Sequence, residues 1–243
     1  MKKEDLPRIW EIDFLRGLAI ILMVGYHLLY DLGDFVGISK FLGFSTDLST
    51  PAWLVAQHFF AGLFVFLSGI SSNLSRNNFR RSLKYLAVAL IITLVTYLFD
   101  PPSAIYFGII HCLGVSVIIY SLAFKKARPV FCLLTGILII GLTSLLPSLN
   151  RALSLESNWL LPLGIHSLGF ASYDYFPLIP WFGVFLAGVA AGRWFYTSKK
   201  SLIPRTPPEN FINWCGRHSL LIYLLHQPII IGVLYLLGYV TLF

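Results

Sequence analysis

The strongest constraint on the fold of this chain is a series of seven apolar stretches, each close to the length that crosses a lipid bilayer. Of its 243 residues, 57% are hydrophobic and only 12% are charged, and the mean hydropathy is +0.76, which is typical of membrane proteins. A helix needs about 20 apolar residues to span the bilayer. The sequence therefore predicts an all-α, polytopic membrane protein, one membrane-embedded domain over 1–243, with helices at 14–33, 52–74, 83–99, 104–124, 129–148, 177–196 and 217–240.

The lysines and arginines predict how these helices are oriented. With seven spans, sixteen of the 18 basic residues fall on one side of the membrane, and only Lys40 and Arg151 fall on the other. Basic residues concentrate on the cytoplasmic side of membrane proteins. The N-terminus is therefore expected in the cytoplasm. Because the net charge of +7 comes from short runs between apolar segments, no nucleic-acid partner is expected.

The cysteines do not suggest a metal site or a disulfide framework. Cys112, Cys132 and Cys215 are scattered through or beside apolar stretches, with no CxxC pair. Isolated cysteines in apolar stretches usually pack as small core residues, so no metal site is predicted.

Four of the six histidines lie inside the predicted spans, namely His27, His58, His111 and His226. An ionisable side chain is costly in the bilayer, so each is a candidate functional residue. Histidine has a near-neutral pKa and acts as a general base in many enzymes. The alternative for each is a hydrogen-bonded bridge between helices. All four are candidate catalytic or cavity-lining residues.

Two further positions in the first span support His27. Asp31 lies four residues later, on the same helical face, and is expected to accept a proton from the His27 ring and orient it. Arg16 lies eleven residues before His27, about 16 Å along a helix. Arg16 and Arg217 both fall at the predicted cytoplasmic surface, where arginine suits the phosphate groups of a donor molecule.

Several segments resemble a known family of membrane acetyltransferases. The run DFLRGLAIILMV at 13–24 resembles the opening of the heparan-α-glucosaminide N-acetyltransferase catalytic domain, a family with many short bacterial members. The spacing of Arg16 and His27 is similar to a signature of the related transmembrane acyltransferases that O-acetylate sugars and lipids. Further similarities occur at 64–69, 108–114 and 216–228, so the resemblance covers nearly the whole chain, and its first and last motifs are the more specific ones.

The resemblance implies an enzyme in a bacterial inner membrane that takes acetyl groups from cytoplasmic acetyl-CoA. It implies a catalytic role for His27 and a donor-binding role for Arg16. The acceptor would be a hydroxyl or amine of an extracytoplasmic or lipid-linked molecule, with a glycan favoured. Direct transfer and an acetyl-histidine intermediate both stay open. A homodimer is also left open.

Two other functions are compatible with intramembrane histidines. Histidines paired across helices could ligate haem in a membrane redox protein, or could relay protons in a proton-coupled transporter. Haem ligation does not explain the spacing between Arg16 and His27 or the cytoplasmic arginines. The sequence of the seven spans shows no internal inverted repeat of the kind that many transporters have.

Overall fold

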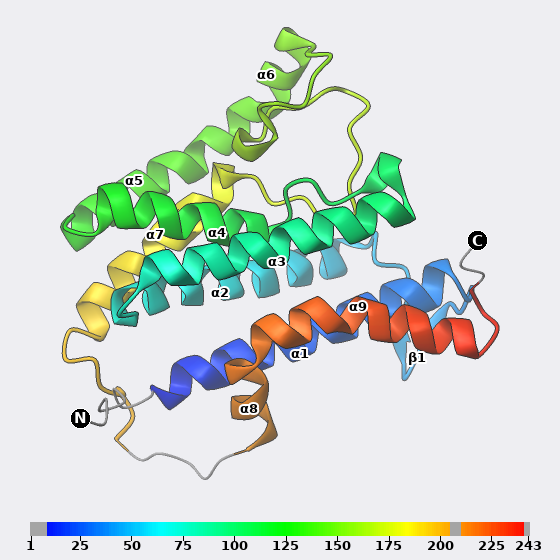
Figure 1. Ribbon diagram of the computed structural model, residues 1–243, viewed down its shortest axis with the longest axis horizontal. Helices are drawn as coiled ribbons and strands as arrows, with labels where there is room; N and C mark the ends of the chain where they lie inside the picture. The colour runs from blue at the N-terminus through cyan, green and yellow to red at the C-terminus, as the bar shows by residue number, and fades with distance from the viewer. Residues whose placement is uncertain (1–8, 205–209, 241–243) are drawn as a thin grey trace. The chain divides into compact units, whose positions relative to one another are not determined.

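A computed structural model describes residues 9–204 and 210–240 and is 71% helical with almost no sheet (Figure 1). Six helical segments are long and apolar enough to cross a membrane, and each overlaps a span predicted from sequence. The all-α, polytopic prediction is therefore confirmed. The helices are α1 (Trp10–Asp34), α2 (Pro51–Leu74), α3 (Asn78–Phe99), α4 (Ile109–Ile119), α5 (Pro129–Gly141), α6 (Leu146–Leu153), α7 (Leu178–Phe195), α8 (Phe211–Arg217) and α9 (Ser219–Leu236).

The fourth predicted span, 104–124, is shorter in the structure. The apolar helix covers Ile109–Phe124 and ends in a π-helical turn, Tyr120–Phe124. Residues before it are extended, because the chain there bonds to a later loop: Phe176 N donates to Phe107 O at 3.0 Å, and Ile109 N donates to the Asp174 carboxylate at 3.0 Å. The cap at Ile109 comes from a residue 65 positions away, which local sequence patterns do not reveal.

The last predicted span, 217–240, is also divided differently. Helix α8 ends at Arg217 and α9 begins at Ser219, with His218 between them in a non-helical conformation. Helix α9 ends at Leu236, and Gly238 follows with a φ of +79°. Glycine adopts this left-handed conformation without steric strain and commonly ends helices.

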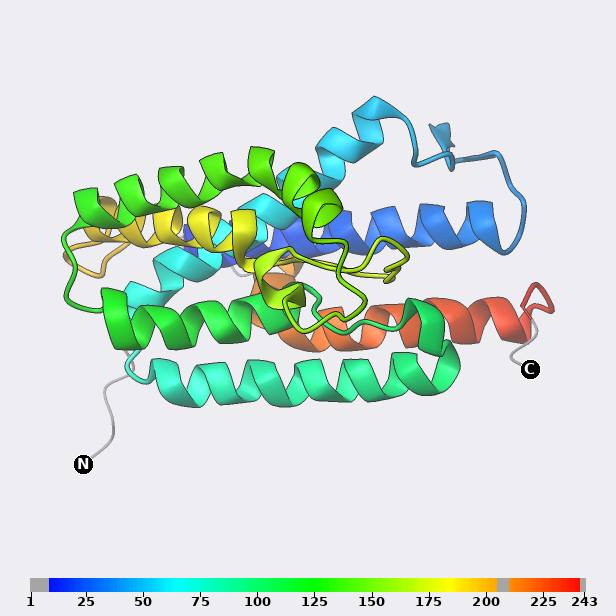
Figure 2. The ribbon, with the colours of Figure 1, turned by 90° about the horizontal axis from the view of Figure 1, so that it is seen from above.

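The chain forms two compact units, and α2 passes from one to the other. The first unit comprises 1–64 and 200–243, and the second comprises 65–199. In the second unit α5 packs against α7, and α3 packs against α4 (Figure 2). The α5–α7 contact is close because Gly136 faces Gly183: a Cβ at Gly136 would lie 2.7 Å from the Gly183 carbonyl oxygen. Small residues of this kind let membrane helices approach closely.

Arg193 ties together one end of the second unit. Its guanidinium donates to the carbonyl oxygens of Phe124 at 2.8 Å, of Lys125 at 3.0 Å and of Ala127, and to Asn73 Oδ1 at 3.1 Å. These carbonyls belong to the end of the π-helical turn and the residues after it, where few backbone N–H donors remain; Phe124 O also accepts from Ala127 N at 3.1 Å. Arg193 therefore satisfies a helix terminus.

We expect Arg193→Met to lower the free energy of unfolding by about 3 kcal/mol, because hydrogen bonds to a charged group are lost and several carbonyls lose their donor. Arg193→Lys keeps the charge but not the planar array of donors, so about half of the loss is expected to remain. Thermal unfolding in detergent measures both variants. A lysine variant as stable as the wild type would show that charge alone matters.

The first unit is built on α1, α8 and α9. Helix α1 contacts both α8 and α9, and α1 and α9 lie side by side in both views (Figures 1 and 2). Near the start of α1, Gly17 lies against α8, and near its end Asp31 bonds to Gln227 of α9. Helices α1 and α9 therefore run in the same direction. The loop after α1 contains a two-stranded hairpin, β1 (Lys40–Phe41) and β2 (Phe44–Ser45).

Candidate active site

A contact between two glycines brings the two predicted donor-binding arginines to the same helix junction. A Cβ at Gly17 would lie 1.9 Å from Ile212 O, and one at Gly216 would lie 1.7 Å from Asp13 O. The backbones of α1 and α8 therefore touch here. Arg16 and Arg217 each adjoin one of these glycines, so the contact sets both arginines at one end of the first unit.

Arg16 and Arg217 have different surroundings at this junction. Arg16 Nη1 lies 3.2 Å from Asp13 Oδ1, in an ion pair whose side chains are 19% and 17% exposed. Arg217 is half-buried and ends α8. The start of α1 is held by Glu11, whose carboxylate accepts from the Ser201 hydroxyl at 2.5 Å and from Leu202 N at 2.7 Å. The start of α1, which carries Arg16, is thus held by the segment before α8.

Farther along α1, two of the predicted histidines meet. The rings of His27 in α1 and His226 in α9 have centroids 4.9 Å apart and are tilted by 57°. Arg16 lies eleven residues before His27, about 16 Å along α1. Helices α1 and α9 therefore form a histidine pair at one level, and α1 and α8 hold the two arginines at another.

The hydrogen bonds of His226 fix the position of its ring proton. Nδ1 lies 2.6 Å from the carbonyl oxygen of Tyr223, which only accepts. Nδ1 therefore carries the hydrogen in the neutral ring, and Nε2 carries a lone pair. His226 is 9% exposed, and Nε2 is buried with no hydrogen-bond partner among the described residues. The structure thus presents a buried base with its accepting nitrogen available.

Asp31 is fully buried, at 0% exposure, and is bound by a residue next to His226. Gln227 Nε2 lies 3.0 Å from each oxygen of the Asp31 carboxyl group. Both oxygens of the carboxyl group accept from this amide. The amide must then turn its Oε1 elsewhere, and within 9–204 and 210–240 this buried atom has no partner. Gln227 therefore adds a second unpaired acceptor near the histidine pair.

The sequence predicts that Asp31 orients His27 directly. Both lie on one face of α1, but the hydrogen bonds recorded for the Asp31 carboxylate among the described residues run to Gln227. Asp31 is thus hydrogen-bonded to Gln227, the residue that follows His226 in α9. A role for Asp31 at His27 stays a prediction.

His58 is not part of the ring contact between His27 and His226. It is exposed on α2, and its Nδ1 lies 2.7 Å from the carbonyl oxygen of Leu54, one turn earlier. This hydrogen bond lies within α2 and does not link His58 to the other predicted site residues.

His111 belongs to the second unit, and both of its ring nitrogens are engaged. Gly108 N donates to Nδ1 at 3.2 Å, so in the neutral ring Nε2 carries the hydrogen and donates to Thr93 Oγ1 at 3.1 Å. Thr93 in turn donates to Ile105 O at 2.7 Å. His111 has the contacts of a side chain that caps the start of α4, whereas His226 keeps a nitrogen for other chemistry.

Sequence reasoning missed Gln227 as a site residue and the role of Gly17 and Gly216. The available signals were weak: an amide next to a histidine in an apolar helix, and a glycine beside each arginine. Only the packing of α1 against α8 and α9 distinguishes these residues from ordinary helix contacts.

Fold and site together define a class of protein: a multi-pass, α-helical membrane protein with a buried carboxyl group and a histidine pair in its apolar helices. Among the described residues, no group of three or more His, Cys, Asp or Glu side chains is arranged to hold a metal ion.

The family model described as "Heparan-alpha-glucosaminide N-acetyltransferase, catalytic" matches residues 8–228. The chain belongs to this family, so the resemblance seen in the sequence is confirmed. The family and the apolar helices together make it a membrane protein of the acetyltransferase class. Neither the curated proteins nor the solved structures gave a significant match to this chain. The matched range includes Arg16, His27, Asp31, Arg217 and His226.

Proposed function

We propose that the protein transfers an acetyl group from cytoplasmic acetyl-CoA to a hydroxyl or amine of an extracytoplasmic or lipid-linked acceptor, and that it resides in a bacterial inner membrane. The observation that carries the proposal is the buried, unpaired Nε2 of His226 beside the His27 ring, in a chain of an acetyltransferase family. Such a nitrogen is suited to take the proton that the acceptor loses.

The proposed orientation follows from the charges and from the direction of two helices. Sixteen of the 18 basic residues favour a cytoplasmic N-terminus. Helices that run in the same direction cross the membrane in the same sense, so the parallel α1 and α9 favour an odd number of spans. This supports counting Ile109–Phe124 as a seventh span beside the six longer ones. Arg16 and Arg217 then face the cytoplasm, and the histidine pair lies deeper.

In this orientation the arginines meet the donor from the cytoplasm. Arginine binds phosphate through paired N–H donors, and Arg16 and Arg217 flank one helix junction. Acetyl-CoA bound there would extend its long pantetheine arm toward His27, which lies about 16 Å farther along α1. Acetyl-CoA is thus the expected substrate and partner at this end, with the bilayer around the helices.

The chemical step needs a base and a charge that balances it. The acceptor oxygen or nitrogen forms a bond to the acetyl carbonyl carbon, the C–S bond breaks, and the acceptor proton moves to the histidine pair before it passes to the CoA thiolate. Two rings 4.9 Å apart do not both hold a charge readily, because like charges repel. In this proposal the Asp31 carboxyl group, which Gln227 binds, supplies the negative charge that balances one imidazolium.

Donor binding tests this proposal directly. We expect the purified protein in detergent to bind acetyl-CoA, and we expect Arg16→Ala and Arg217→Ala each to weaken binding about tenfold, since each loses a charge-assisted contact with phosphate. Arg80→Ala is the matched control, because Arg80 is an exposed arginine of α3 on the same predicted side. Isothermal titration calorimetry measures the affinities. Absence of acetyl-CoA binding, or equal losses in all three variants, would contradict the proposal.

A further inference from the structure

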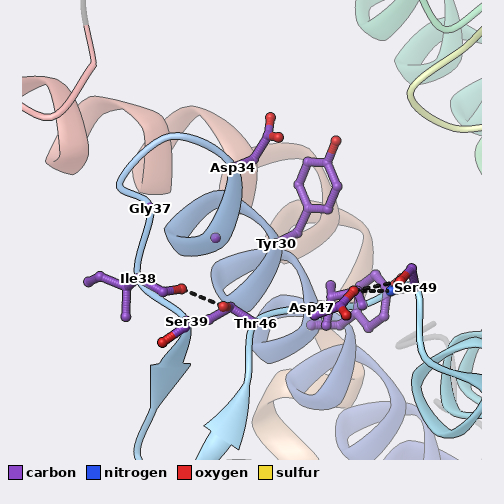
Figure 3. Close-up of a pocket in the computed structure, with 11 residues that line it drawn as sticks. Tyr30, Asp34, Gly37, Ile38, Ser39, Thr46, Asp47 and Ser49 are labelled. Carbon is purple, nitrogen blue, oxygen red and sulfur yellow. Dashed lines mark hydrogen bonds between the residues drawn. The ribbon is translucent and has the colours of Figure 1, made fainter.

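A cavity of about 540 Å³ lies at the end of α1 and under the loop that follows it. Tyr30 and Asp34 extend from α1, while Ser39, Thr46, Asp47 and Ser49 come from the loop (Figure 3). Tyr26 and Gly33 of α1 complete its helical side. All lining residues fall between Tyr26 and Ser49, so one continuous stretch of chain in the first unit forms the cavity.

The loop is held against α1 by specific contacts. A Cβ at Gly33 would lie 3.0 Å from the carbonyl oxygen of Thr46, so glycine allows the loop to approach the helix. The Thr46 hydroxyl donates to the carbonyl oxygen of Ile38 across the base of the β1–β2 hairpin. These contacts give the cavity a defined wall.

The cavity is acidic. Its lining contains two carboxylates, Asp34 and Asp47, and no lysine or arginine among the described residues. Asp47 Oδ1 accepts from the Ser49 hydroxyl at 2.6 Å and from Ser49 N at 3.0 Å. The bond from the Ser49 hydroxyl has the larger effect and the bond from Ser49 N the smaller one, and both lower the pKa of Asp47 below its usual value. Lys40 begins β1 next to Ser39 but lies outside the lining.

One residue of the cavity lining touches the histidine pair. The ring of Tyr26, which lines the cavity, contacts the ring of His27 with centroids 5.9 Å apart. Tyr30 and Asp34 lie three and seven residues after His27, on the same face of α1. Seven residues correspond to about 10 Å along the helix, so a molecule of monosaccharide size in the cavity would approach the His27 level.

We infer that this cavity binds the acetyl acceptor and selects uncharged or ammonium-bearing polyols against sulfated, phosphorylated or carboxylated ones. The inference rests on the proposed function for the identity of the reaction. Hydroxyl and carboxylate groups of the lining would bond to the hydroxyls or ammonium group of such an acceptor, and the two carboxylates would repel an anionic substituent. The charge of the cavity thus sets which acceptors enter.

Matched acceptors test the selectivity. Purified protein in detergent receives acetyl-CoA with N-acetylglucosamine or its 6-sulfate, and with glucosamine or its 6-sulfate, and CoA release is followed. We expect kcat/KM to be at least about tenfold lower for each sulfated sugar. Asp34→Asn combined with Asp47→Asn is expected to reduce this ratio to about threefold or less. Glu156→Gln removes an exposed carboxylate outside the lining and should leave the ratio unchanged. Equal use of sulfated and unsulfated sugars, or stimulation by neither, would overturn the inference.

A second measurement separates this inference from the proposed function. Ser39→Cys is labelled with a cationic or an anionic methanethiosulfonate reagent, and the ratio of rates is compared with that at Leu168→Cys, on an exposed loop. We expect the cationic reagent to be favoured at Ser39→Cys by at least about fivefold more than at the control, and less so in the double aspartate variant. Equal cationic-to-anionic rate ratios at Ser39→Cys and Leu168→Cys would overturn the inference, and this measurement does not require acetyl transfer. Failure to bind or cleave acetyl-CoA would instead refute the proposed function, while the labelling result would still decide the charge selectivity.

Discussion

Replacing either His27 or His226 with alanine is expected to lower the rate of acetyl transfer by about 10²–10⁴-fold, the usual contribution of a general base. The two rings lie 4.9 Å apart, and Nε2 of His226 is buried without a partner among the described residues. If they hold one proton between them, removal of either ring abolishes the same step. The double variant should then be no more than about tenfold slower than the slower single variant, since residues that act as a unit are non-additive. Steady-state CoA release measures all three.

His166→Ala is the control for this cycle. His166 lies in the loop before α7, where its Nδ1 is 2.9 Å from the carbonyl oxygen of Ser167 and its ring contacts Phe170. We assign it no part in the reaction and expect a rate within about twofold of the wild type. Losses at His27 and His226 that multiply in the double variant would show two independent roles and would refute the shared site.

Gly17→Ala is expected to destabilise the protein strongly, because its Cβ would lie 1.9 Å from the Ile212 carbonyl oxygen. No side-chain rotation relieves a clash between Cβ and backbone, so α1 and α8 must separate. Overpacking of this kind costs about 1–3 kcal/mol or more, and we expect the thermal midpoint in detergent to fall by at least about 5 °C. Acetyl-CoA affinity should fall as well, since the same contact sets Arg16 and Arg217.

Gly25→Ala makes the same chemical change eight residues later in α1. A Cβ at Gly25 meets no atom within 4 Å, and alanine favours helix by about 1 kcal/mol over glycine. This variant should be as stable as the wild type or slightly more stable. Equal destabilisation by both alanines would mean that helix conformation, and not the contact with α8, determines the effect.

Much of the helical layout could be predicted from the sequence because the bilayer imposes a length and a composition on each span. The start of α4 could not be predicted, since it is capped by Asp174 and the residues just before it bond to a loop 65 or more residues later. The break at His218 was also missed, because an apolar run continues on both sides of it. Long-range hydrogen bonds decide such boundaries, and hydropathy does not record them.

The candidate site was predicted in its residue types but not in its connections. Burial cost alone identifies His27, Asp31 and His226 as unusual in apolar helices. Which histidines meet, and which nitrogen of His226 keeps its lone pair, depends on α1 packing beside α9 and on the Tyr223 carbonyl. The same reasoning separates His111, whose nitrogens are both engaged, from His226.

The sequence by itself determined the class of this protein, the approximate position of its spans and its family, because these follow from composition and from motifs along the chain. Only the tertiary structure decided that the first and last helices run together, that Gly17 and Gly216 bring the arginines to one junction, and that Gln227 binds Asp31. Contacts between residues about 200 positions apart depend on helix packing, which leaves no periodic pattern in the sequence.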